Sequence, residues 1–201
     1  MGRVVCIRLI RITLISIMLG ASGCAVIPMI AAIPSAVVEP LFGQFGSEVR
    51  SLPISMRKSL VATQRSLKDT KFDLDILEIV DNGYNIRFGS GELSGGIELR
   101  AQTESLTSIS VQVRGKTRED SVEKAVLRQI EETAAKIGKR EHFDFHSYNY
   151  LRKKPDVKSK QIGWYRPGAQ LAVKKTYKKP EWLKLKLPSG AHAFLKGSVQ
   201  Q

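Results

Sequence analysis

Cysteine is scarce in this sequence: Cys6 and Cys24 are the two cysteines among 201 residues, which excludes a fold built on several disulfide bonds. Histidine occurs three times, and aromatic residues make up 7% of the chain. Acidic residues are outnumbered, since 19 Asp and Glu stand against 32 Lys and Arg, for a net charge of +13. Hydrophobic residues make up an ordinary 42%, which argues against collagen-like, disordered and multi-span membrane classes.

The excess positive charge is concentrated near the C-terminus. Residues 142–201 contain thirteen Lys and Arg but three Asp and Glu, a net charge of +10. Residues 24–141 contain sixteen charges of each sign and sum to zero. The basic character therefore belongs to the C-terminal segment, and a field of that sign attracts anionic partners.

Residues 1–23 have the layout of a secretory signal peptide. Three arginines precede an apolar run, which ends in the small residues Ala21-Ser22-Gly23 directly before Cys24. This ending resembles the lipobox of bacterial lipoproteins, although Ala21 stands where Leu is preferred. The resemblance implies that 1–23 is a lipoprotein signal peptide and that Cys24 becomes the lipidated first residue, carrying an acyl group such as palmitate.

An uncleaved membrane anchor is the alternative for this region. Residues 12–38 carry no charge, and a stretch of that length can span a bilayer as a helix. Pro28 and Pro34 argue against it, because each removes a helical hydrogen bond and clashes with the preceding turn. Both alternatives export the rest of the chain, since the arginines favour the cytoplasmic side.

The residue after Cys24 bears on the destination. Ala25 resembles the sorting residue of lipoproteins sent to the outer membrane. We therefore expect a cell-envelope protein, lipid-anchored in the outer membrane and facing the periplasm. Residues 24–50 are rich in apolar and small residues, without helical or alternating periodicity, and are predicted to form a lipidated tether.

Residues 51–140 are predicted to form one small α+β domain of unknown function. Apolar residues at spacings of three and four indicate a helix over about 54–69 and a second one that ends near 138. Between them, alternating segments at 72–76, 84–88, 97–101 and 109–113 indicate an antiparallel sheet with both helices on one face. This order after a lipobox resembles a family of small bacterial lipoproteins of unknown function, which implies no catalytic residues.

Residues 146–201 are predicted to form a separate all-β barrel, because short strands alternate there with turn residues. The segment resembles the bacterial Src homology 3 (SH3-like) domain. Five stretches follow that family's order and spacing: 150–155, 159–163, 167–173, 182–185 and 190–195. The departures are Lys153-Lys154 in the first loop and Ala193-Phe194 near the end. The resemblance implies a binding module rather than an enzyme.

Basic residues interleaved with aromatic ones are the candidate ligand-binding residues of this segment. They are Tyr150, Arg152, Trp164, Tyr165, Lys174, Lys175, Trp182 and Phe194. For such a surface at a membrane we expect peptidoglycan or another anionic envelope polymer as the ligand. One alternative is a structural or assembly factor that binds partner proteins at the membrane; another is that the aromatic residues are core and the lysines a solvated edge.

No constellation of catalytic residues is visible in the sequence. The carboxylates of 51–140 are scattered, and His142, Asp144 and His146 alternate with apolar residues as in an amphipathic linker. We therefore expect no enzymatic activity, no cofactor and no metal. Export of the chain also argues against nucleic acid as a partner.

We expect the mature N-terminus to be an acylated Cys24, because Ser22-Gly23-Cys24 follows the apolar run. Several acyl chains anchor a protein stably, whereas one chain binds a membrane only marginally. The intact mass of protein extracted from membranes should show the loss of residues 1–23 and the addition of lipid. A Cys24→Ser control should lack the lipid. A membrane-extracted chain that retains residues 1–23 and carries no lipid would contradict the prediction.

Overall fold

The computed structural model describes residues 48–169, 173–175 and 181–197, all of which belong to one compact unit. The elements follow in the order β1 (Val49–Leu52), α2 (Met56–Asp69), β2 (Asp73–Val80), β3 (Gly83–Ser90), β4 (Leu93–Thr103), β5 (Leu106–Arg114), α3 (Asp120–Ala134), β6 (Asn149–Arg152), β7 (Gln161–Tyr165), β8 (Val173–Lys175), β9 (Trp182–Lys186) and β10 (His192–Lys196). No helix in these ranges is long and apolar enough to cross a membrane.

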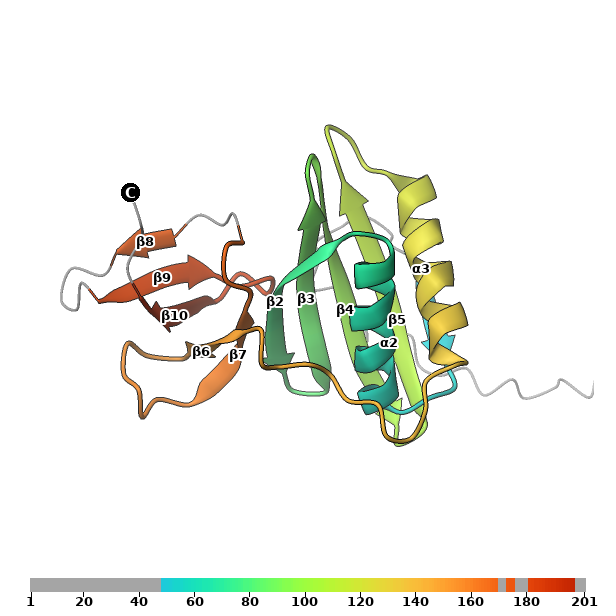
Figure 1. Ribbon diagram of the computed structural model, residues 1–201, viewed down its shortest axis with the longest axis horizontal. Helices are drawn as coiled ribbons and strands as arrows, with labels where there is room; N and C mark the ends of the chain where they lie inside the picture. Colours follow the sequence, from blue (N-terminus) through green and yellow to red (C-terminus); the bar gives the residue numbers. More distant parts are fainter. Residues whose placement is uncertain (1–47, 170–172, 176–180, 198–201) are drawn as a thin grey trace, which may run out of the picture. The chain divides into compact units, whose positions relative to one another are not determined.

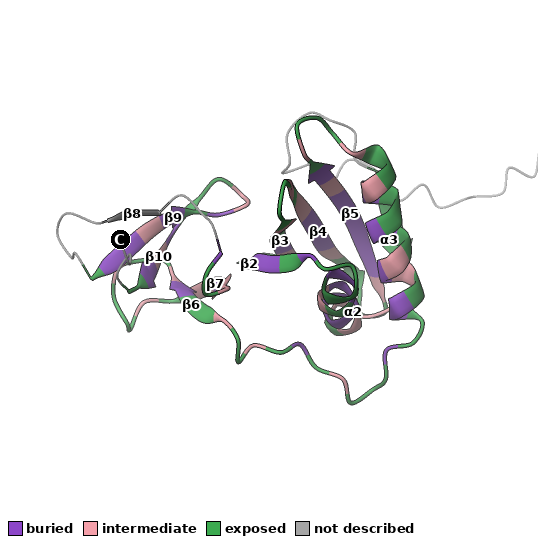
Figure 2. Ribbon diagram, turned by 45° about the horizontal axis from the view of Figure 1, so that its top comes forward, coloured by how far each residue is buried: buried purple, intermediate pink, exposed green. Residues whose placement is uncertain are grey.

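Helices α2 and α3 cover one face of strands β2–β5 (Figure 1). The helical spacing buries Leu60 and Leu67 of α2 and Ile130 of α3, and these pack on the inward side chains of the strands. In Figure 2 the buried residues of α3 lie on its side toward β5, and its outer side is exposed. The helices predicted from apolar spacing, and the strands predicted from alternation, therefore form.

The fold class predicted from the sequence is nevertheless wrong. The ten strands of the described residues belong to one antiparallel sheet, in the order β1-β5-β4-β3-β2-β7-β6-β10-β9-β8. The sheet is open, because β1 and β8 end that order and do not pair with each other. The C-terminal strands therefore continue the first sheet instead of closing into a separate barrel. Whether 51–140 and 146–201 fold independently stays a prediction.

The continuity depends on the pairing of β2 with β7. Glu78 of β2 lies opposite Gly163 of β7. A β-carbon at Gly163 would overlap the carbonyl oxygen of Leu77, so glycine is what allows the two strands to approach. Next to this pairing, β2 has a bulge at Asp75, whose carbonyl accepts a hydrogen bond from the backbone N–H of Arg166 at 2.9 Å.

Two buried or partly buried carboxylates add side-chain contacts to the same junction. The guanidinium of Arg166 donates to Asp75 at 2.8 Å. The carboxylate of Glu78, which is 4% exposed, accepts hydrogen bonds from the backbone N–H and the hydroxyl of Ser189. Because both carboxylates accept hydrogen bonds from donors of the same chain, their burial is compatible with a stable fold.

The chain between α3 and β6 is fastened to α2 rather than free. The side-chain amide of Gln64 donates to the carbonyl of Asp144 and accepts from its backbone N–H, at 3.1 and 2.9 Å. Phe143 is buried in the core beneath the helices. Arg65 forms an ion pair with Glu141 at 2.9 Å. Because these contacts fix the segment to α2, they also restrict where β6 begins.

The glycine at the junction gives a stability prediction. Gly163→Ala should lower the free energy of unfolding by about 2 kcal/mol, because the added methyl must displace the β2 backbone. Gly197→Ala is the control, since a β-carbon there meets no atom within 4 Å. Urea denaturation of both variants measures the difference. Equal midpoints for the two would show that β2 and β7 do not require the close approach.

Candidate functional site

Strands β6, β9 and β10 have alternating side chains, with an apolar residue buried at every second position and Trp182 of β9 as a buried exception on the opposite side. One side of these strands carries Leu151, Leu183, Leu185, Ala193 and Leu195, which are buried in a second core together with Ile76 of β2. The residues between them point to the other side. The local sequence thus fixes which side chains the three strands present to solvent.

The outward side of these strands is basic and aromatic. It comprises Tyr150 and Arg152 of β6, Lys184 of β9, and Phe194 and Lys196 of β10, and we call these five residues the cationic face. Arg152 lies opposite Phe194, and Phe194 lies opposite Lys184, so three of the five form one row across the strands. The row continues to Lys174 of β8 in the backbone register.

Carboxylates are absent from the strands that carry this face. Strands β6, β8, β9 and β10 contain no Asp or Glu in their sequences. Among the described residues, the ion pairs involve Arg50, Arg65, Arg100, Arg118 and Arg166, and none involves a cation of the cationic face. The positive charge of the face is therefore not neutralised within that part of the chain.

Tyr150 and Arg152 contact each other on this face. The guanidinium carbon of Arg152 lies 5.6 Å from the centre of the Tyr150 ring, within the range of a cation–π contact. Arg152 also donates to the carbonyl of Ser159 at 3.0 Å. Tyr150 remains 55% exposed. A charged group and a largely exposed ring thus lie side by side on this face.

The loop between β6 and β7 extends the positive charge beyond Arg152. Lys153, Lys154, Lys158 and Lys160 line an open hollow of about 480 Å³ together with Asp156 and Ser159. The loop is shaped by its own hydrogen bonds, since the backbone N–H of Lys154 donates to the Ser159 hydroxyl and that of Lys158 to the Asp156 carboxylate. Four lysines against one aspartate make this loop a second cationic element beside the face.

Three of the predicted aromatic residues are packed into the protein and are not open to a ligand, although Trp164 lies opposite Tyr150 and Trp182 opposite Lys196 in the sheet register. Trp164 packs on Phe145, with ring centres 4.5 Å apart, and contributes to the core beneath the helices. Trp182 is 4% exposed. Tyr165 packs against the second core, and its hydroxyl donates to the carbonyl of Ala169 at 2.8 Å. Burial, with a contribution from the Asp75 carboxylate, raises the pKa of Tyr165, so it stays neutral at physiological pH.

The remaining predicted residues are placed in part or not at all. Lys174 and Lys175 lie in β8, opposite Lys184 and Leu183, and their side chains are outside the description. Cys24 lies outside the described residues. Sequence reasoning missed Lys184 and Lys196, although their alternation with Leu183, Leu185 and Leu195 is visible in the sequence and would have identified them.

The described residues contain no group of three His, Cys, Asp or Glu side chains that could hold a metal ion. No family model matches the chain, and no curated protein matches it. The two family resemblances seen in the sequence therefore stay predictions, and the case for function depends on the charge and the geometry of the site.

Proposed function

We infer that this is a non-enzymatic, lipid-anchored protein of the cell envelope, whose basic C-terminal strands bind an anionic envelope polymer such as peptidoglycan. The observation that carries the proposal is the cationic face. Its Arg152, Lys184 and Lys196 have no ion-pair partner in the described residues, and their strands contain no acid. Charge left unneutralised on an ordered surface favours an anionic ligand.

The spacing of the face suits a polymer better than a single small anion. Neighbouring strands lie about 4.8 Å apart, so the row from Arg152 to Lys184 presents cations about 10 Å apart with Phe194 between them. A polymer that bears carboxylates at repeated intervals, as peptidoglycan does on its stem peptides, can meet such cations in succession. The rings of Tyr150 and Phe194 offer apolar contacts, which salt does not screen.

The proposed anchor at Cys24 would make weak binding sufficient. A protein tethered to a membrane meets the adjacent polymer at a high effective concentration, so each contact needs little affinity of its own. The outer membrane, with the chain facing the periplasm, is the location we propose. The support for this location is the ending of the signal-like segment before Cys24.

An assembly factor that binds partner proteins is the second candidate. The observation that favours it is the open sheet, whose order in the described residues ends in β1 and β8. Val49 of β1 is 51% exposed. Such an edge can accept an extended segment of another protein as an added strand. The experiment below separates this candidate from polymer binding.

Cosedimentation of the detergent-purified full chain with purified peptidoglycan tests the proposal. We expect binding at low salt that weakens as salt rises. Reversing two charges of the face, Lys184→Glu with Lys196→Glu, should weaken binding about tenfold at low salt, which corresponds to about 1.4 kcal/mol. Tyr150→Ala should instead reduce the binding that persists at physiological ionic strength.

The matched control changes the same net charge elsewhere. Lys116→Glu with Lys124→Glu reverses two exposed lysines near the start of α3, and it should leave the sedimented fraction unchanged. An equal loss in both double variants would reveal a general effect of net charge rather than a site. If the folded wild-type chain is not retained at any salt concentration, polymer binding is wrong and the assembly role takes its place.

A further inference from the structure

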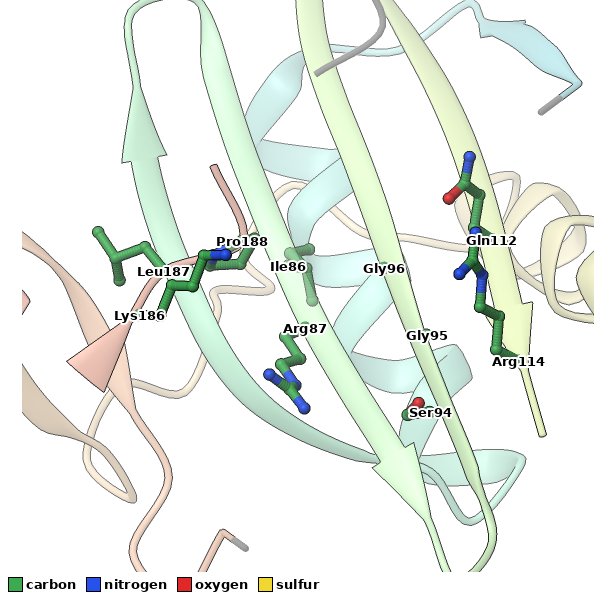
Figure 3. A pocket seen from close by; sticks show the side chains of 10 residues that line it. All are labelled: Ile86, Arg87, Ser94, Gly95, Gly96, Gln112, Arg114, Lys186, Leu187 and Pro188. Carbon is green, nitrogen blue, oxygen red and sulfur yellow. The ribbon is translucent and has the colours of Figure 1, made fainter. Parts of the chain in front are cut away.

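A cavity of about 390 Å³ lies on the face of the sheet that the helices leave uncovered (Figure 3). Its floor is formed by β3, β4 and β5, and its side wall by Lys186, the last residue of β9, with Leu187 and Pro188 after it. The residues that matter for its chemistry are Arg87, Ser94, Gly96, Gln112, Arg114 and Lys186. The volume falls within the range of small-ligand pockets.

The cavity is strongly positive. Arg87, Arg114 and Lys186 line it, and no Asp or Glu is among its lining residues. Arg87 and Lys186 are exposed, and neither forms an ion pair within the described ranges. Arg87 and Lys186 at the same hollow repel each other, and a bound anion relieves that repulsion.

The sheet register places the polar groups on opposite sides of an open floor. Arg87 of β3 pairs with Gly96 of β4, and Gly96 pairs with Gln112 of β5. Two strand spacings separate Arg87 from Gln112, which is about 10 Å, and the central residue of the row has no side chain. In the next row Ser94 lies opposite Arg114. A ligand can therefore rest on the β4 backbone between two arginines.

The side wall is held in place by a buried polar network. Ser189, at the turn after Pro188, donates two hydrogen bonds to the buried Glu78. Glu78 also accepts from the Asn85 side-chain amide, and Asn85 accepts from Arg100 at 2.5 Å. The turn is closed by a bond from the Leu187 N–H to the Ala191 carbonyl at 2.8 Å. Lys186 is thus presented from a fixed wall rather than a loose loop.

We propose that this cavity is a binding site for a small ligand with two linked phosphate groups, a diphosphate or its ester. Guanidinium groups match phosphate oxygens in fork geometry, and Lys186 supplies a compact charge at the wall. A single phosphate would fill little of the hollow and would not reach cations on opposite sides. The proposal does not rest on the polymer-binding function, because the cavity and the cationic face share no residue.

Calorimetric titration of the full chain with inorganic diphosphate is the test, with inorganic phosphate as the comparison. Diphosphate should bind more tightly than phosphate. Arg87→Gln and Lys186→Gln should each weaken diphosphate binding about tenfold. Arg128→Gln, at an exposed position of α3, is the matched control and should have no effect. Lys184→Glu with Lys196→Glu should also leave diphosphate binding unchanged, which separates this site from the cationic face.

A second experiment distinguishes a lipid headgroup from a soluble ester as the source of the diphosphate group. The chain, with its acylation site removed by Cys24→Ser, is mixed with neutral phospholipid vesicles that do or do not contain a polyprenyl diphosphate. Binding to the doped vesicles that is lost in Arg87→Gln indicates a lipid headgroup, whereas binding of diphosphate in solution alone indicates a soluble ester. Diphosphate binding that is absent, or equal in wild type, Arg87→Gln and Lys186→Gln, overturns the proposal.

Discussion

The close pairing of β2 with β7 is the constraint on which the rest of the described structure depends. A side chain at position 163 would overlap the Leu77 carbonyl and force β2 and β7 apart, so Gly163 favours the pairing that joins the chain after α3 to β2. The bulge at Asp75 and the turn at Ser189 supply hydrogen bonds on either side of the pairing. One backbone contact therefore positions both the outward face of β6, β9 and β10 and the wall of the cavity.

The distribution of acids explains why the two halves differ electrostatically. In the first half, several carboxylates accept hydrogen bonds within the fold. Glu123, although burial alone would raise its pKa, is held below its usual pKa by hydrogen bonds from Arg118 and from the Val113 backbone. Such acids are structural, since each satisfies donors of its own chain. The C-terminal strands have no acids to do this. Lysines on such strands oppose edge-to-edge pairing with other chains.

The sequence alone allowed the prediction of those helices and strands that have a periodic pattern of apolar residues. The apolar stripes of α2 and α3 and the alternation of β2 to β5 lie within short windows, so those elements were predictable. The pairing of Glu78 with Gly163 joins residues far apart in the chain and leaves no local pattern, which is why a separate barrel was predicted in place of one open sheet. Tyr150, Arg152 and Phe194 were found from composition, but composition does not distinguish an exposed ring from the buried Trp182.

The buried hydrogen bonds of Glu78 position the turn that forms one wall of the cavity on the helix-free face. Removing a charged carboxylate from water is costly, and its partners offset the cost only when they stay in place. Ser189 and Asn85 provide those partners from two different parts of the chain. An apolar residue at this position would pack without specifying where the turn after Pro188 lies, whereas a carboxylate requires its donors at hydrogen-bond distance. Through these donors the acid ties the turn after Pro188, and with it the wall that presents Lys186, to β2 and β3.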